Sequence, residues 1–128
     1  MNFGILGEAK IAREHVVPAI LNAGHKVTHV GRRIPGQAAL PKIYGNAIET
    51  DYEALINDTS VDAIYNPLPN HLHVPYSIEA LKAGKHVLCE KPVALNLDEL
   101  SQLENAAKDS KAFFYEAFMV RSHPQWHW

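Results

Sequence analysis

Short runs of β-forming residues alternate with helical patterns along the chain, and this alternation limits its possible folds more than any other feature. The sequence predicts six strands, over residues 3–6, 27–30, 47–48, 61–66, 86–89 and 112–115. Strands that alternate with helices build a mainly parallel sheet covered on both faces. Because crossovers are right-handed, we expect an α/β fold of the doubly wound type, with strand order 3-2-1-4-5-6.

Capping and stop residues predict where the helices begin and end. A first helix is expected from Lys10 to about Ala23, ended by Gly24 and kinked at Pro18, since proline removes a backbone hydrogen bond. Three later helices are expected, over residues 51–56, 74–83 and 96–107. Asp51 is the predicted cap of the first of these, and either Asn96 or Asp98 caps the last. A short helix is also expected over 36–44, and the tail over 118–128 has no periodicity.

Composition and charge exclude several functional classes. The 128 residues are the size of one domain, and the net charge of −2 offers no basic face for nucleic acid. The single cysteine, Cys89, rules out an internal disulfide. No apolar run approaches the ~18 residues of a membrane helix, and no signal peptide is recognisable. We therefore expect a cytoplasmic domain, with neither nucleic acid nor membrane as a partner.

The turn after the first strand carries an imperfect phosphate-binding pattern. It reads Gly-Glu-Ala-Lys-Ile-Ala from Gly7 to Ala12, where the dinucleotide fingerprint has glycine at the first, third and sixth places. Gly7 can make the tight turn, and Ala9 is small enough to let pyrophosphate approach the free N–H groups of a helix start. The alternative is a strand-to-helix turn with no ligand.

The end of the second strand predicts which dinucleotide is bound. Sites specific for NAD usually have an acidic residue there, about 20 residues beyond the glycine turn, to hold the ribose hydroxyls. This chain has Gly31, Arg32 and Arg33 instead. Two guanidinium groups without a carboxylate favour a 2′-phosphate, and so NADP over NAD. The alternative is a solvated loop with two surface arginines.

Two further segments, with the stretch before the tail, indicate a family. Residues 66–73 read Asn-Pro-Leu-Pro-Asn-His-Leu-His, and residues 84–92 read Gly-Lys-His-Val-Leu-Cys-Glu-Lys-Pro. With the Glu-Ala-Phe-Met run at 116–119 and residues 121–125, they resemble the glucose–fructose oxidoreductase and inositol dehydrogenase family, especially its dihydrodiol and xylose dehydrogenase branch. The resemblance covers essentially the whole chain. It implies a Rossmann domain over 1–117, a tail over 118–128, and hydride transfer between a nicotinamide cofactor and a sugar, polyol or diol.

The resemblance also implies roles for individual residues. Four would hold the pyrophosphate: Gly7, Ala9, Lys10 and Ile11. Arg32 and Arg33, after Gly31, would meet the adenosine ribose or its phosphate. The cofactor cleft would be lined by Leu68, Asn70 and His73, and the nicotinamide end would be contacted by Glu90, Ala117 and Arg121.

Lys91 is the candidate catalytic residue. In such an enzyme it would reach the reacting hydroxyl or carbonyl, donate a hydrogen bond, and transfer the proton if its surroundings lower its pKa. Pro92 would fix the turn that aims Lys91, and we expect a cis bond between the two. The alternative for Lys91 is a surface lysine paired with Glu90.

The pair of histidines at 71 and 73 raises the question of a metal site. His71 and His73 flank one leucine, but no second cluster has the spacing of metal ligands, so no metal is expected.

The same family has a second, larger domain that supplies most of the substrate pocket, and this chain stops at Trp128. Two hypotheses follow. The chain is either the cofactor half of a dehydrogenase or a nucleotide-binding or interaction module with no turnover of its own. We expect weak dinucleotide binding, little turnover, and self-association to a homo-oligomer through apolar residues of the tail: Phe118, Met119, Trp126 and Trp128.

Overall fold

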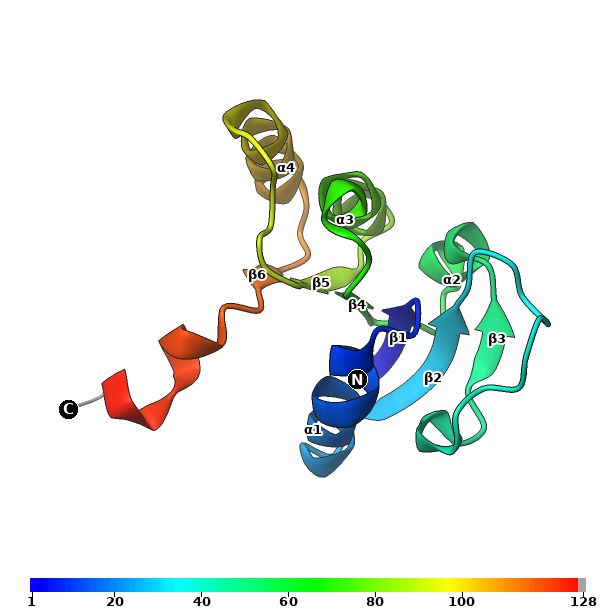
Figure 1. Ribbon diagram of the computed structural model, residues 1–128. Coiled ribbons are helices and arrows are strands. Elements are labelled where there is room, and N and C mark those ends of the chain that lie inside the picture. The colour runs from blue at the N-terminus through cyan, green and yellow to red at the C-terminus, as the bar shows by residue number, and fades with distance from the viewer. Residues whose placement is uncertain (127–128) are drawn as a thin grey trace.

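A six-stranded parallel sheet forms the centre of the protein in the computed structural model, which describes residues 1–126 (Figure 1). The strand order is β3-β2-β1-β4-β5-β6, as predicted, and every neighbouring pair is parallel. The strands are β1 (Asn2–Leu6), β2 (Lys26–Gly31), β3 (Ile48–Thr50), β4 (Ala63–Asn66), β5 (His86–Cys89) and β6 (Phe114–Glu116). The predicted doubly wound fold is confirmed, with strand ends displaced by at most two residues.

Helices cover the two faces of the sheet unequally. The first helix lies on one face, whereas α2 (Tyr52–Asn57), α3 (His73–Lys82) and α4 (Leu97–Asp109) lie on the other (Figure 1). Each face has its own apolar core. The larger core centres on Leu55, Ile64 and Leu81, and the smaller on Ile5 and Val30 beneath the first helix. The alternation of buried side chains along β1 and β4 therefore supplies both cores.

The first helix changes its hydrogen-bonding pattern close to Pro18. Helical backbone begins at Lys10, forms a π-helical turn (η1, Ala12–Val16), and continues as α1 (Val17–Asn22). The N–H of Val17 donates to the carbonyl of Ala12, five residues back. Pro18 is the second residue of α1 and has no N–H to donate, so the continuous helix lacks one backbone hydrogen bond there. The predicted interruption at Pro18 is thus accompanied by a π-helical turn that precedes it.

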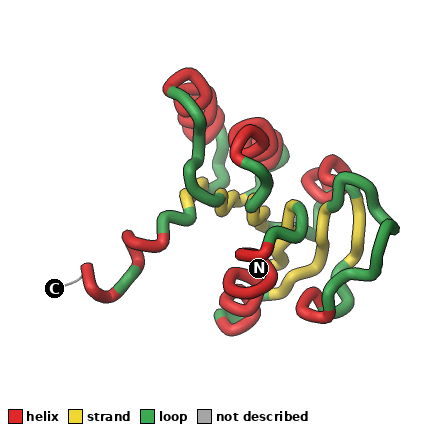
Figure 2. The backbone as a smooth tube through the Cα atoms, in the orientation of Figure 1, coloured by secondary structure: helices red, strands yellow, loops and turns green. Residues whose placement is uncertain are grey.

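The predicted helix over 36–44 is wrong. The connection from β2 to β3 is a long loop with one short 3₁₀ turn, η2 (Lys42–Tyr44), as Figure 2 shows. Pro41 is extended, with φ −52° and ψ 141°, and so the turn begins only after it. Gly36 has φ +80°, which is outside the helical region.

The helix caps agree with the sequence. Asp51 accepts a hydrogen bond from the N–H of Ala54 at 2.7 Å. Of the two predicted caps for α4, the structure selects Asn96, whose side chain accepts from the N–H of Glu99 at 2.9 Å. The tail forms two 3₁₀ turns, η4 (Met119–Ser122) and η5 (Pro124–Trp126), and Trp128 lies outside the described residues.

No helix within the described chain is long and apolar enough to span a membrane. The parallel strands end together at one edge of the sheet, which gathers the residues that follow β1, β2, β4 and β5. Most of the residues predicted to bind the cofactor lie at that edge.

Candidate functional site

The turn after β1 brings a glycine and a helix start to the carboxyl edge of the sheet. Gly7 has φ +79°, a conformation that favours glycine, and its N–H donates to the carbonyl of Gly31 at 2.8 Å. A Cβ atom on Gly7 would lie 3.2 Å from Cδ2 of Leu68. The helix then begins at Lys10, and the first turn of any helix leaves backbone N–H groups without internal partners. The turn therefore has the backbone geometry of an anion site.

A cleft of about 610 Å³ lies at the same edge, between the residues after β2 and those after β4. Arg32 and Arg33 line one side of this cleft, and Leu68 lines the other. Tyr52, at the start of α2, also lines it, and Tyr52 approaches both Gly7 and Gly31 closely. The structure thus brings the predicted adenosine-binding residues together around one hollow.

Arg32 is not free, which corrects the expectation that no carboxylate faces the two arginines. Its Nε donates to Oε2 of Glu8 at 2.5 Å, and its Nη1 donates to Oε1 of Glu49 at 2.9 Å and to the carbonyl of Ala38. Burial alone would lower the pKa of Arg32, but the hydrogen bonds to both carboxylates outweigh burial and raise it. The neighbouring Arg33 has an exposed side chain.

Glu49 is a residue that the sequence analysis missed. It lies in β3 and accepts from the N–H of Gly36 at 2.7 Å as well as from Arg32. Because β3 is paired with β2, a carboxylate near the end of β3 necessarily approaches the residues after β2. The predicted third strand stopped at residue 48, and so Glu49 and Thr50 were not considered as neighbours of Arg32.

Tyr44, in η2, is a second residue that the sequence analysis missed. Its hydroxyl is buried and has no hydrogen-bond partner among the described residues. Burial raises the pKa of Tyr44 to about 12, and the negative charge of Glu8 contributes to the rise. Tyr44 therefore keeps its proton at neutral pH.

The loop after β4 is held in place by buried polar side chains. Asn66 donates to the carbonyl of His73 at 3.1 Å and accepts from the N–H of Leu68 at 3.2 Å. The ring of His73 is 1% exposed and bridges the carbonyls of Leu68, at 2.7 Å, and Pro92, at 2.8 Å. His73 therefore does not line the cleft as expected, because its ring lies in the interior and joins two loops. Asn70 is exposed in η3 (Asn70–Leu72).

The segment after β5 contains the candidate catalytic lysine. The Lys91–Pro92 bond is cis, as predicted, and the Lys91 side chain is exposed. Glu90 is oriented by a hydrogen bond from the buried hydroxyl of Tyr65 at 2.8 Å, and its own N–H donates to the carbonyl of Asn66 at 3.0 Å. Burial raises the pKa of Tyr65, and the Glu90 carboxylate raises it further. The ion pair between Lys91 and Glu90 that was the alternative is not formed in this structure.

An apolar groove of about 600 Å³ lies on the face of β5 and β6 that α1 leaves uncovered. Glu90 and Ala117 both line it, as do Leu88 and Phe118. Ala117 is fixed to the sheet by the hydrogen bond from its N–H to the carbonyl of Cys89 at 2.7 Å. Arg121 is exposed in η4. Two of the three residues predicted at the nicotinamide end thus share one hollow.

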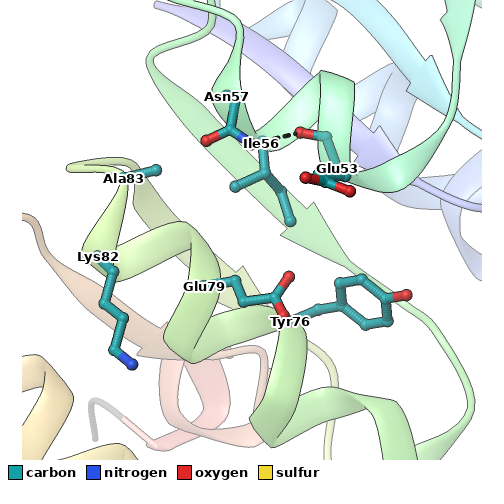
Figure 3. A pocket seen from close by; sticks show the side chains of 7 residues that line it. All are labelled: Glu53, Ile56, Asn57, Tyr76, Glu79, Lys82 and Ala83. Atoms are coloured by element: carbon teal, nitrogen blue, oxygen red, sulfur yellow. Dashed lines mark hydrogen bonds between the residues drawn. The ribbon is translucent and has the colours of Figure 1, made fainter.

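A further hollow of about 580 Å³ lies between α2 and α3 (Figure 3). Glu53 and Tyr76 line both this hollow and the cleft beside Arg33, and so the two are adjacent. Figure 3 shows Tyr76 and Glu79 on α3 facing Ile56 and Glu53 on α2. None of the predicted site residues lies there. Over residues 1–126, no group of three or more His, Cys, Asp or Glu side chains could hold a metal ion.

Comparisons with known proteins agree with this geometry. Residues 1–118 match the model of the oxidoreductase family with an NAD-binding Rossmann fold. The chain is 42% identical to an uncharacterised oxidoreductase of Rhizobium meliloti, over 98% of this chain and 39% of that protein. It is 39% identical to the NADP⁺-dependent D-xylose 1-dehydrogenase 2 of Haloferax volcanii, over 97% of this chain and 39% of that protein.

A solved structure gives the same result. The fold matches a 3-ketoreductase from Actinomadura kijaniata, in complex with TDP-benzene and NADP, with a TM-score of 0.90 and 33% identity over 99% of this chain and 41% of that one. The chain spans about two fifths of the length of these relatives. The chain therefore belongs to the oxidoreductase family with an NAD-binding Rossmann fold, and its cofactor is a nicotinamide dinucleotide, NAD or NADP.

Proposed function

We propose that the chain binds NADP(H) in preference to NAD(H) along the carboxyl edge of its sheet, as the cofactor half of an oxidoreductase that acts on a sugar, polyol or diol. One observation carries this proposal: the Gly7 turn, the start of the first helix and the cleft beside Arg33 lie next to one another. A dinucleotide needs an anion site beside a hollow for adenosine, and these residues fit both requirements.

Each predicted residue has a task at this edge that matches its chemistry. Gly7 would make the turn, the backbone N–H groups from Glu8 to Ile11 would hold the pyrophosphate, and Ala9 leaves room for it. Arg33, which is exposed on the cleft, would contact the 2′-phosphate, and Leu68 would contact the adenosine. The 2′-phosphate is the group that distinguishes NADP from NAD, so Arg33 supports the preference for NADP(H).

Lys91 is proposed to hold the reacting oxygen of the substrate. When bound, the nicotinamide cofactor supplies or accepts the hydride. In reduction, the ammonium of Lys91 would donate a hydrogen bond and then its proton to the carbonyl oxygen. In oxidation, the neutral amine of Lys91 would accept the proton of the alcohol. The hydrogen bond between the ring of His73 and the carbonyl of Pro92, at 2.8 Å, and the hydrogen bond from the N–H of Val93 to Glu116, at 3.0 Å, fix the loop that carries Lys91.

The substrate class is proposed from the relatives, which include a D-xylose dehydrogenase and a trans-1,2-dihydrobenzene-1,2-diol dehydrogenase. Lys91 is exposed, and the groove beside Glu90 is open. Hydride transfer needs a substrate held in near-attack geometry with water excluded. We therefore expect the isolated 128-residue chain to bind the cofactor and to turn over sugars and diols far below about 1 per second.

The pyrophosphate role of the turn is tested by the Ala9→Asp variant. A carboxylate at this place would repel the pyrophosphate that NADPH and NADH share, so we expect both dissociation constants to rise by at least about tenfold. The Gln102→Glu variant, which adds a negative charge on the exposed side of α4, is the control. Unchanged binding of both cofactors by a folded Ala9→Asp variant would contradict the proposal.

Self-association through the tail is proposed from the side chains exposed there. Phe118 is 45% and Met119 69% exposed, beside the uncovered apolar face of β5 and β6. We expect sedimentation to show concentration-dependent dimers that are lost in a Phe118→Ser/Met119→Ser variant. They should be retained in Leu97→Ser, which removes an apolar side chain that is 79% exposed on α4. A monomer at all concentrations would refute this proposal.

A further inference from the structure

The guanidinium of Arg32 has almost no free donor. An arginine has five N–H groups, in a planar arrangement. In Arg32, Nε donates to Glu8, Nη2 lies 2.5 Å from the same Glu8 oxygen, and Nη1 donates to Glu49 and to the carbonyl of Ala38. Within the described part of the chain, at most one N–H of Arg32 is left for an anion. Its side chain is 11% exposed, against 24% for Glu8 and 20% for Glu49.

Glu8 occupies the edge of Arg32 that a phosphate would need. A guanidinium binds phosphate best through two parallel N–H groups, and the Nε–Nη2 pair is one such edge. That edge is filled by the carboxylate of Glu8. Glu49 is anchored more firmly, because it also accepts from the N–H of Gly36. Among the described residues, Glu8 has no other hydrogen-bond partner, and so its contact is the one that an incoming phosphate would replace.

We propose that Glu8 is a specificity-determining residue, whose carboxylate competes with the 2′-phosphate of NADP(H) for the Nε–Nη2 edge of Arg32. This inference rests on the proposed cofactor function. The two cofactors differ only in the 2′-phosphate, and so the competition weakens NADP(H) binding and leaves this part of NAD(H) binding untouched. Glu8 therefore lowers the ratio of the NADH to the NADPH dissociation constant, and so reduces the preference for NADP(H) that the two arginines create.

The ratio of the two dissociation constants isolates this effect. Glu8 lies in the turn proposed to hold the pyrophosphate, so removing its charge will help both cofactors through that shared group. Any change in the ratio of NADH to NADPH dissociation constants reports on the 2′-phosphate alone. An ion pair that is partly exposed contributes modestly, and we expect the Glu8→Gln variant to raise this ratio by about fivefold.

Five variants make the test specific. Glu8→Gln and Glu8→Ser each remove the charge, so the test can still be made if one of the two fails to fold. Glu14→Gln is the matched control, because it removes a negative charge from the helix that follows this turn; the one ion pair of Glu14 among the described residues is with Lys10, at 3.9 Å. Arg32→Ala, alone and combined with Glu8→Gln, completes a double-mutant cycle, in which Glu8→Gln should leave the ratio unchanged once Arg32 is absent. Binding is measured by titration with NADPH and with NADH, and folding by circular dichroism.

The possible outcomes distinguish a failure of the role proposed for Glu8 from a failure of the proposed dinucleotide binding. A rise in the ratio in both Glu8 variants, but not in Glu14→Gln or in the Arg32→Ala background, supports the role of Glu8. Equal changes for both cofactors, or a rise that persists without Arg32, overturn it while leaving dinucleotide binding intact. A wild-type chain that binds neither cofactor overturns the proposed function, and this inference with it.

Discussion

The two arginines after β2 differ in what each can do, although they are neighbours in the sequence. Arg32 is enclosed by Glu8, Glu49 and the carbonyl of Ala38, whereas Arg33 is exposed on the cleft. A sequence pattern places charges along the chain but gives no information on which are neutralised by a neighbouring strand. Arg33 is therefore the residue whose removal tests the 2′-phosphate contact most simply.

We expect Arg33→Ala to weaken NADPH binding by about 1.5 kcal/mol, roughly tenfold, because a hydrogen bond between charged groups is lost. NADH binding should change less than twofold. Titration of both cofactors measures the difference, and Lys82→Ala, which removes an exposed cation from α3, is the control. If the binding of NADPH and of NADH weakens equally, Arg33 contacts a part of the dinucleotide other than the 2′-phosphate.

His73 is a second residue whose structural role could not be predicted from the sequence. The resemblance placed it in the cofactor cleft, but its ring is buried and bridges the carbonyls of Leu68 and Pro92. The sequence gives the place of His73 along the chain, whereas the direction of its side chain depends on the packing of α3 against β5. The positions of Gly7 and Glu90 were easier to predict, because each directly follows a clear strand.

Among the elements, the packing of α2 against the sheet depends on two strand glycines, Gly4 in β1 and Gly31 in β2. A Cβ atom on Gly31 would lie 2.9 Å from Cδ1 of Tyr52 and 3.2 Å from Cδ1 of Leu55. We expect Gly31→Ala to lower the free energy of unfolding by about 1–3 kcal/mol through overpacking. Urea unfolding measures it, with Gln102→Ala on exposed α4 as a control that should change by less than about 0.5 kcal/mol. A Gly31→Ala variant as stable as the wild type would contradict this prediction, because it would mean that α2 moves away from the sheet at no cost in stability.

Elements with strong local signals were predictable, and those without them were not. The buried strand β5 and the caps Asp51 and Asn96 were found because hydrophobic runs and side-chain caps act locally. The loop between β2 and β3 was misjudged as helical over 36–44, a stretch that Pro35 precedes and Pro41 interrupts, and only its last three residues form a helical turn. The π-helical turn before α1 had no recognisable sequence signal beyond Pro18.

At the scale of the whole molecule, acid should unfold the protein partly through carboxylates whose pKa is lowered. The N–H of Gly36 and the guanidinium of Arg32 lower the pKa of Glu49 below its ordinary value of 4.5. Hydrogen bonds from Ser60 lower the pKa of Asp58 below 3.8. A carboxyl group whose pKa is lower in the folded state contributes stability above the unfolded value, and loses it as the pH falls through the folded value.

We therefore expect the free energy of unfolding to be steady above about pH 5 and to fall as the pH drops below 4.5. Glu49→Gln should lower stability at neutral pH and flatten part of this acid dependence. Glu14→Gln should leave the pH profile unchanged, because Glu14 is exposed. Urea unfolding at a series of pH values tests the prediction, and identical profiles for wild type and Glu49→Gln would contradict it.

The site as a whole follows from the topology, because a parallel sheet gathers the ends of its strands at one edge. The order of the strands was predictable from their alternation with helices, and the order alone places Gly7 beside Arg32 and Glu90 near the residues after β4. The apolar groove beside β5 and β6 was not predictable, because it lies between the first helix, the sheet and the tail, and no local sequence signal sets how these parts pack.

The central claim is that a dinucleotide binds across this edge, and backbone amide chemical shifts recorded during titration with NADPH test it most directly. A chain of 14.3 kDa is suited to this measurement. The account predicts that the largest shift changes fall on residues 7–11 and 31–33 and on Leu68 and Asn70, with smaller ones at Glu90 and Ala117. No change at saturating NADPH, or changes confined to the hollow between α2 and α3, would contradict it.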